Sequence, residues 1–250
     1  MSVDSTMVAI PAGHIELRDA RLDTVREVQL VAFRMSATAV TGAQWAEVTG
    51  EERSRHDVPV HPVTWLEAVA WCNAASVRDG VAAAYTITGD TVAWDVASDG
   101  YRLPTEAEWE WACRAGTSTP TYGALADIAW TADDDVVGPQ GVGLKQPNGF
   151  GLYDTIGNVW EWCWDYADTA RYADYRTLRG GGWADRAWSC RASVRRGSAP
   201  DAVLEDVGFR VARGAVGAPG SQAAQGWSAE ADALRASKTG PLPLGWTPLR

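Results

Sequence analysis

The groups in this chain that could do chemistry are its thiols, imidazoles and carboxylates. The cysteines lack the C-x-x-C spacing of a zinc site. They are Cys72, Cys113, Cys163 and Cys190. His56 and His61 lie five apart in a proline-containing segment, which is not the spacing of helical metal ligands, and His14 is the remaining histidine. We therefore expect buried thiols and surface or capping histidines.

Glu106, Glu108 and Glu110 are the densest group of carboxylates, and their context predicts a structural role. Thr105 and Glu108 form the capping box of a helix that begins after Pro104. Residues two apart on a helix point to different sides, so the acids are not expected to converge on one substrate. We expect buried or half-buried pairs with arginines, because a guanidinium suits bidentate contact with a carboxylate. The candidate arginines are Arg179, Arg191, Arg195 and Arg210.

Capping signals predict the helices that position these residues. A capping box opens each of three segments, at residues 41–50, 64–80 and 105–116, and each segment ends in glycine. Periodicity places an apolar face on the second helix. Its predicted members are Leu66, Val69, Ala70, Asn73 and Val77.

Alternating patterns predict short strands around the helices. Residues 7–33 alternate loosely, and residues 85–95 alternate on both sides of Gly89–Asp90, which is typical of a hairpin. Residues 117–149 are rich in Gly, Asp and Pro and are predicted as loop. Trp160, Trp162 and Trp164 alternate along a further strand, where we interpret them mainly as core.

Composition and charge exclude some classes of partner. The chain has 250 residues, 14 of them Trp, with 25 Gly and 12 Pro, which favours a loop-rich fold held by large aromatics. Its net charge of -10 argues against binding to nucleic acid or to an anionic membrane. The N-terminus lacks a signal-peptide pattern and no stretch has transmembrane length, so we expect a cytoplasmic protein.

The composition changes after Arg213, which predicts a domain over residues 1–213 and an extension over residues 214–250. Residues 214–226 have the composition of a linker, and residues 228–238 could form a short helix. Trp227 and Trp246 favour an extension packed on the domain, because two exposed indoles would be costly. The alternative is a partner-binding extension.

Four segments together resemble the formylglycine-generating-enzyme (sulfatase-modifying factor) family. They are YRLPTEAEWE at 101–110, NGFGLYD at 148–154, IGNVWEW at 156–162, and LRGG at 178–181 with GFR at 208–210. The resemblance covers residues 7–213. It implies an α+β fold, a variant of the C-type lectin fold that is loop-rich, with small twisted sheets and two main helices.

The resemblance also shows what is missing. True members oxidise a substrate cysteine to formylglycine with O2 and copper, using two cysteines after an Arg-Gly-Gly-Ser motif, and Cu(I) favours such thiolates. Asp185 takes the place of the first cysteine, and the segment is too short to hold the second. We therefore expect no copper. Cys113 and Cys190 match a pair that is joined in secreted relatives, so we predict that they are neighbours, present as thiols in a cytosol.

The resemblance implies one structural calcium site. Its ligands would be Asp154, Glu161 and the backbone carbonyls of Gly157 and Val159. A hard cation takes oxygen ligands, and a glycine turn lets carbonyls converge with carboxylates. In the alternative interpretation, Asp154 caps the turn and Glu161 binds an arginine.

The segment that lines the substrate groove of the enzymes here contains Trp183, Asp185, Arg186 and Trp188. We predict a shallow groove bordered by these residues, with the loop 199–206 beside it. The predicted ligand-binding set also includes Arg195, Ala202 and Leu204. The alternative places both tryptophans in the core and Asp185–Arg186 in a solvated turn.

Two functions fit the sequence. The first is a ligand-binding protein, since this fold family includes the variable proteins of diversity-generating retroelements. The corresponding segments would be 184–189, 194–199 and 202–206. The second is a non-copper tailoring enzyme, an oxidoreductase or hydrolase, with Asp185 as metal ligand or base. The sequence supplies no matching nucleophile–base pair for that enzyme.

Overall fold

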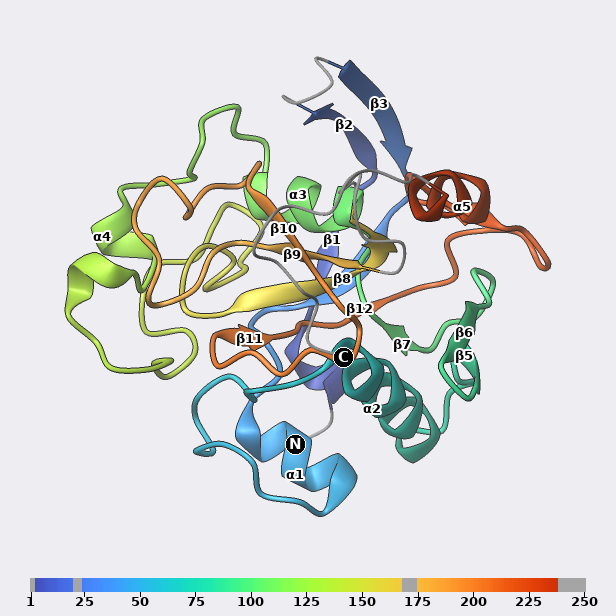
Figure 1. Cartoon of the computed structure of the whole chain (residues 1–250), viewed down its shortest axis with the longest axis horizontal. Coiled ribbons are helices and arrows are strands. Elements are labelled where there is room, and N and C mark those ends of the chain that lie inside the picture. The colour runs from blue at the N-terminus through green and yellow to red at the C-terminus, as the bar shows by residue number, and fades with distance from the viewer. Residues whose placement is uncertain (1–2, 20–23, 168–174, 238–250) are drawn as a thin grey trace.

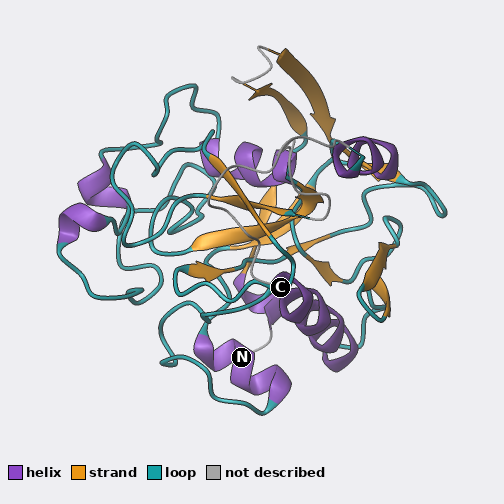
Figure 2. Cartoon of the chain, viewed as in Figure 1, coloured by secondary structure: helices purple, strands orange, loops and turns teal. Residues whose placement is uncertain are grey.

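The computed structural model describes residues 3–19, 24–167 and 175–237, and Figure 1 traces the chain. Helices lie around two four-stranded sheets, short hairpins project at the periphery, and long loops link these elements (Figure 2). No helix within the described ranges is long and apolar enough to cross a bilayer.

The predicted helices are confirmed, and each begins at its predicted capping box. They are α1 (Gly42–Thr49), α2 (Trp65–Arg78) and α3 (Glu106–Arg114). The threonine caps are Thr41, Thr64 and Thr105. Helix α1 ends at Gly50 as predicted, whereas Asp79 and Ala115 cap α2 and α3, each one residue before the predicted glycine.

The buried face of α2 differs from the predicted one. The face turned to the core carries Trp65, Ala68, Val69, Cys72 and Ala75, while Val77 is 70% exposed. Two tertiary contacts account for the difference. Helix α2 packs against α1 and against the strand β7 (Tyr101–Arg102), and the Trp65 indole donates a hydrogen bond to the carbonyl of Cys163 at 3.0 Å.

The first sheet joins both ends of the domain. Its strands are ordered β1 (Met7–Ile10), β4 (Phe33–Ser36), β12 (Ala212–Arg213) and β7 (Tyr101–Arg102). A short 3-10 helix, η1 (Val3–Thr6), precedes β1. Strand β12 pairs with β4 and β7, so the chain after residue 211 closes against the strand at residues 33–36.

Two hairpins extend from this sheet. The first, β2 (Gly13–Asp19) with β3 (Thr24–Leu30), projects at the top of Figure 1 and packs its apolar face on α3. The second, β5 (Tyr85–Thr88) with β6 (Thr91–Trp94), is the hairpin predicted around Gly89–Asp90. The strands predicted between residues 7 and 33 are therefore present.

The second sheet carries most of the family-like motifs. Its strands are ordered β10 (Arg195–Ser198), β9 (Arg176–Arg179), β8 (Trp160–Tyr166) and β11 (Val207–Gly208), with β11 parallel to β8. Helix α3 packs on β8 and β9. Trp160, Trp162 and Trp164 are all buried, which confirms their place in the core.

Loops dominate the left side of Figure 1. Residues 117–149 contain only two short helical turns, α4 (Leu125–Ile128) and η2 (Ala132–Asp134). This loop contacts the chain that follows β9, because Ala132 donates its N–H to the carbonyl of Asp185 at 2.9 Å. The loop therefore supports the segment predicted to bind ligand.

The chain beyond residue 213 is ordered where the composition predicts a linker. Strands β13 (Ala223–Ala224) and β14 (Trp227–Ser228) form a hairpin that leads into α5 (Ala229–Ala236), the predicted short helix. We call residues 223–236 the strap. Trp227 is buried against Trp94 and Trp164, so the strap packs on the domain. Trp246 lies outside the described residues.

Candidate functional site

A fully buried ion pair holds the centre of the second sheet. Arg210 donates from Nε to Oε2 of Glu161 at 2.6 Å and from Nη2 to Oε1 at 2.7 Å. The Trp109 indole also donates to Oε2 at 2.6 Å. Arg210 further reaches the carbonyl of Tyr153 at 2.9 Å, which ties three of the motifs together.

This geometry does not fit the predicted calcium ion. Three donors occupy Glu161, whereas a carboxylate offers about four lone-pair sites. The adjacent Arg210 guanidinium would repel a divalent cation. Oδ2 of Asp154 accepts the N–H of Gly143, from the preceding loop, at 2.7 Å, and Oδ1 is buried without a hydrogen-bond partner among the described residues. The contacts of Glu161 favour the alternative interpretation, in which it binds an arginine, and the calcium site stays a prediction.

The turn at residues 154–158 has a left-handed, tightly packed backbone. Asp154, Gly157 and Asn158 have φ angles of 53°, 76° and 61°, in the left-handed region. A Cβ on Gly157 would lie 2.3 Å from the carbonyl oxygen of Trp130, so only glycine fits there. Val159 is buried in the core. Across the described residues, no group of three or more His, Cys, Asp or Glu is placed to hold a metal ion.

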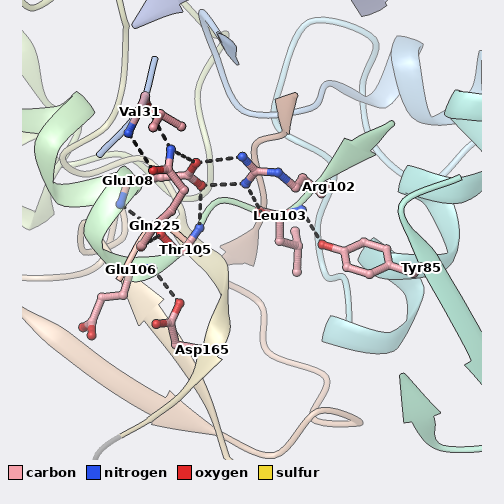
Figure 3. Close-up of polar contacts among 9 residues, drawn as sticks. All are labelled: Val31, Tyr85, Arg102, Leu103, Thr105, Glu106, Glu108, Asp165 and Gln225. Carbon is pink, nitrogen blue, oxygen red and sulfur yellow. Dashed lines mark hydrogen bonds and ion pairs between the residues drawn. The ribbon is translucent and has the colours of Figure 1, made fainter. Parts of the chain in front are cut away.

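The three acids of α3 each pair with an arginine, as predicted. The pairs are Glu106–Arg195, Glu108–Arg102 and Glu110–Arg179. The second is bidentate, at 2.6 and 2.7 Å, and both partners are fully buried (Figure 3). Arg191, which we expected to pair in the same way, is exposed. The acid cluster is therefore structural.

Asp185 braces its loop. Its Oδ2 accepts the Trp160 indole N–H at 2.7 Å and the Gly182 N–H at 2.9 Å. Its backbone carbonyl accepts the N–H of Ala132 from the neighbouring loop. The carboxylate in the copper-cysteine position thus holds the backbone in place, which is the role of a capping residue rather than of an open catalytic base.

The two tryptophans of this segment differ in environment. Trp188 is 69% exposed, and Arg186 beside it is also exposed. Trp183 is half-buried, with an indole N–H that is buried without a hydrogen-bond partner among the residues the structure describes. Trp188 and Arg186 therefore reach solvent, whereas Trp183 and Asp185 support them.

The remaining predicted ligand residues, Arg195, Ala202 and Leu204, are all at least partly buried. Arg195 is bound to buried Glu106 at 2.6 Å and is partly exposed, so its place among the ligand-binding residues stays a prediction. Ala202 and Leu204 are half-buried, and Leu204 packs against the main core. Val203 between them is 70% exposed and was not predicted. Burial alternates along 202–206, but the residue types Ala, Val, Leu, Glu and Asp do not, so no local pattern identified Val203.

Arg196 and Asp206 join the two loop segments and were also missed. Their side chains form an ion pair at 3.6 Å, and the Arg196 guanidinium lies 5.8 Å from the centre of the Trp160 ring. A Cβ on Gly182 would lie 3.2 Å from Cβ of Asp206. Burial raises the pKa of Asp206, opposed by Arg196. The structure thus brings residues 182–185 and 206 together around one indole.

A shallow hollow lies on the loop that adjoins these residues. Its volume is about 560 Å3. Its lining residues are Ala126, Asp127, Trp130, Gly143, Leu144, Lys145, Gln146, Pro147 and Tyr153. None of them belongs to 183–206, so this hollow is a different one, and the groove bordered by Trp183, Asp185, Arg186 and Trp188 stays a prediction.

The cysteines are all buried thiols. Cys113 and Cys190 belong to one buried cluster with Cys163 and Trp109, and their direct contact stays a prediction. Burial raises the pKa of Cys113 and Cys190 to about 12, so both are protonated at neutral pH. They act as small apolar side chains in this structure.

Sequence reasoning missed a second polar network, drawn in Figure 3. The Gln225 side chain, from the strap, accepts the Val31 N–H at 2.9 Å and donates to Glu108 at 2.9 Å. Asp165 accepts the Glu106 N–H at 2.7 Å. Gln225 and Val31 are 194 residues apart, so no local pattern could have linked them.

The small sheets, the long ordered loops and the buried arginine–carboxylate pairs define an α+β domain of the C-type-lectin-fold class. A variable protein of Treponema denticola has this fold, with a TM-score of 0.77 and 30% identity, covering 83% of this chain and 94% of that one. Residues 2–215 match the family described as sulfatase-modifying factor enzyme 1-like domain. The chain belongs to this formylglycine-generating-enzyme family.

Curated relatives include both an active and an inactive enzyme by name. A formylglycine-generating enzyme of Streptomyces coelicolor is 30% identical, over 86% of this chain and 91% of the relative. An inactive C-alpha-formylglycine-generating enzyme 2 of Bos taurus is 28% identical, over 86% and 90%. Membership of the family therefore does not determine whether a chain is an active enzyme, which depends on its site residues.

Proposed function

We propose that this chain is a ligand-binding member of its family rather than a copper oxidase. The observation that supports the proposal is the exposure of Trp188. The residue is 69% exposed, on a loop that Asp185 holds by hydrogen bonds to Trp160 and Gly182. Exposed aromatic and arginine side chains on a rigid support are the residue types that dominate binding energies. Arg186 and Val203 are the exposed neighbours in the two loop segments.

The buried contacts below Trp188, Arg186 and Val203 support this proposal. Trp160, Asp185 and Asp206 fix the two loop segments to β8. Trp160 donates its indole N–H to Asp185 and its backbone N–H to the carbonyl of Asp206 at 2.8 Å. Side chains at the exposed positions could vary without disturbing those contacts. This is what a variable protein requires, and the likeness to the Treponema denticola variable protein is in keeping with it.

Copper chemistry has no ligands at the corresponding place. Asp185 stands in the position of the first copper cysteine, and its Oδ2 already accepts two hydrogen bonds. Cys190 is a buried thiol with a raised pKa, whereas copper binding requires a thiolate. We therefore expect no formation of formylglycine by this chain.

The first test is an oxidation assay. The purified chain is incubated with copper and a cysteine peptide of sulfatase type, and the aldehyde is followed by mass spectrometry. We expect none above the no-protein control, with the Streptomyces coelicolor enzyme as the positive control. Catalytic conversion would overturn the proposal.

The second test measures binding at Trp188. Peptides selected from a displayed random library against the full chain are titrated by calorimetry into wild type, Trp188→Ala and Val77→Ala. Val77 is the matched control, because it is 70% exposed on α2, away from the loop segments. We expect Trp188→Ala alone to abolish binding of the dominant peptides. Equal loss in both variants, or in neither, would contradict the proposed surface.

A further inference from the structure

The strap is held to the domain at three side chains. Gln225 sits between Val31 and Glu108, as described above. Trp227 packs at 5.3 Å from the ring of Trp94 and 5.7 Å from that of Trp164, measured between ring centres. Asp232 is the third anchor. The family match ends at residue 215, so these anchors lie beyond the part of the chain shared with that family.

Asp232 makes one hydrogen bond within the strap and another to β8. Its Oδ2 accepts the Trp227 indole N–H at 2.7 Å, and its Oδ1 accepts the N–H of Tyr166 at 3.1 Å. Arg235, one turn later, donates to Oδ1 at 3.2 Å. Asp232 is 7% exposed, so an added negative charge nearby would act on it with little screening by water.

Asp165 lies beneath this anchor and is incompletely bonded. Its Oδ2 accepts the N–H of Glu106, whereas its Oδ1 is buried without a partner in the part of the chain that the structure describes. Its side chain is fully buried. A buried carboxylate that lacks partners costs free energy when it is ionised, and less when it is protonated.

The charges around Asp165 come from every element packed on it. They are Glu106 on α3, Asp232 and Arg235 on α5, Arg26 on β3, Arg176 on β9 and Cys163 on its own strand. Arg195 neutralises Glu106 at 2.6 Å, and Arg26 donates to the strap carbonyl of Gly226. Burial, followed by the charges of Glu106 and Asp232, raises the pKa of Asp165 to about 7.

We propose that loss of the Asp165 proton releases the strap, so that docking of residues 223–236 weakens as the solution becomes more alkaline. The ionised carboxylate repels Asp232, which anchors the strap, and opening of the strap relieves both this repulsion and the lack of hydration. Release would uncover the ring faces of Trp94 and Trp164. The inference concerns a different face from the loop segments of the proposed ligand surface.

The sign follows from proton linkage. A carboxyl group whose pKa is raised in the docked state binds its proton more tightly there than in the open state. Docking is therefore favoured at low pH and loses that contribution as the pH rises towards 7. Between pH 5 and pH 7 the docking constant should fall by up to about tenfold per pH unit, and above that range it should level off.

Hydrogen exchange on the full chain tests this directly. Protection factors for residues 225–236 are measured from pH 5 to pH 8.5, corrected for the intrinsic pH dependence of exchange, with α2 as the internal reference. We expect strap protection to fall by about ten- to one-hundredfold relative to α2. A constant ratio of strap to α2 protection in the wild type would overturn the proposal by itself, without any variant.

Two substitutions separate Asp165 from other titrating groups. Asp165→Asn, which mimics the protonated carboxyl group, should keep the strap protected at every pH. Asp154→Asn is the matched control, because Asp154 is also a buried carboxyl group with a raised pKa but neighbours Gly143, Arg210 and Glu161 rather than the strap. It should leave the strap response unchanged. An unaltered response in Asp165→Asn would sink the proposal, and if that variant does not fold, the wild-type profile decides.

Discussion

At the residue scale, several buried arginines of this domain pair with buried carboxylates. Arg102 and Glu108 are both fully buried and share two hydrogen bonds. The same Glu108 carboxylate accepts the N–H of Thr105 at the start of α3 and a bond from Gln225. The Glu108 side chain therefore caps a helix, neutralises an arginine and binds the strap through Gln225.

Removing the Glu108 charge should be costly. Glu108→Gln keeps the shape and the capping oxygen but leaves Arg102 buried without its counter-charge, so we expect a loss of about 3–5 kcal/mol in the free energy of unfolding. Urea denaturation measures it. The control is Asp57→Asn, in the exposed pair with Arg55, which should leave the midpoint unchanged. Similar effects of the two substitutions would refute the importance of the buried pair.

A second prediction at this scale concerns calcium. Because Arg210 and Trp109 occupy the Glu161 carboxylate, neither calcium nor a chelator should change the melting temperature of the protein. Differential scanning calorimetry with and without millimolar calcium checks this. A rise in the melting temperature that is lost in Asp154→Ala would restore the calcium site that the family resemblance implies.

At the scale of elements, the strap depends on close packing of its backbone. Gly226 has a φ of 77°, and a Cβ there would lie 2.7 Å from Val28 and 3.0 Å from Ala107. Gly220 has nearly the same φ, 76°, with nothing within 4 Å of such an atom. The two glycines thus share one backbone strain and differ in the space around them.

Alanine at these two positions should separate strain from packing. Both substitutions should cost about 1–2 kcal/mol for a left-handed residue, and Gly226→Ala should cost about 1–3 kcal/mol more for overpacking. Equilibrium unfolding gives both values. Equal losses would mean that the strap moves away from Val28 and Ala107 at no cost.

At the scale of the whole molecule, the buried carboxyl groups set the pH at which the fold is most stable. Burial raises the pKa of Asp154 to about 6 and that of Asp165 to about 7, so their contribution to stability is lost as the pH rises through those values. Burial acts in the same direction on Glu106, but Arg195 and Arg179 outweigh it and hold its pKa below the usual range. Its contribution is lost at acidic pH.

Stability should therefore be greatest near pH 5. We expect the free energy of unfolding to fall by about 2–4 kcal/mol between pH 5 and pH 8. Urea titrations at the two pH values measure this, and the double variant Asp154→Asn with Asp165→Asn should flatten the difference. A wild type that is more stable at pH 8 than at pH 5 would show that these carboxyl groups are hydrated or ionised without penalty.

Local chemistry in the sequence determined the helix starts, the hairpin and the role of the α3 acids. A threonine cap and its glutamate lie three residues apart, so the interaction is visible in the order of residues. The long tryptophan-rich motifs likewise determined the family and its fold. Even so, the buried face of α2 was misplaced, because Val77 follows the helical period but has no neighbour to cover it.

Only the tertiary structure decided which polar groups are available for function. Glu161 and Arg195 carry the residue types of ligands, yet Arg210 and Glu106 occupy them, from positions 49 and 89 residues away. Asp165 has the sequence context of an ordinary acid in a strand. Its pKa is raised by burial and by the charges of Glu106 and Asp232, which come from distant segments. Burial and counter-charge depend on contacts between distant segments, and a local pattern of residues contains no record of them.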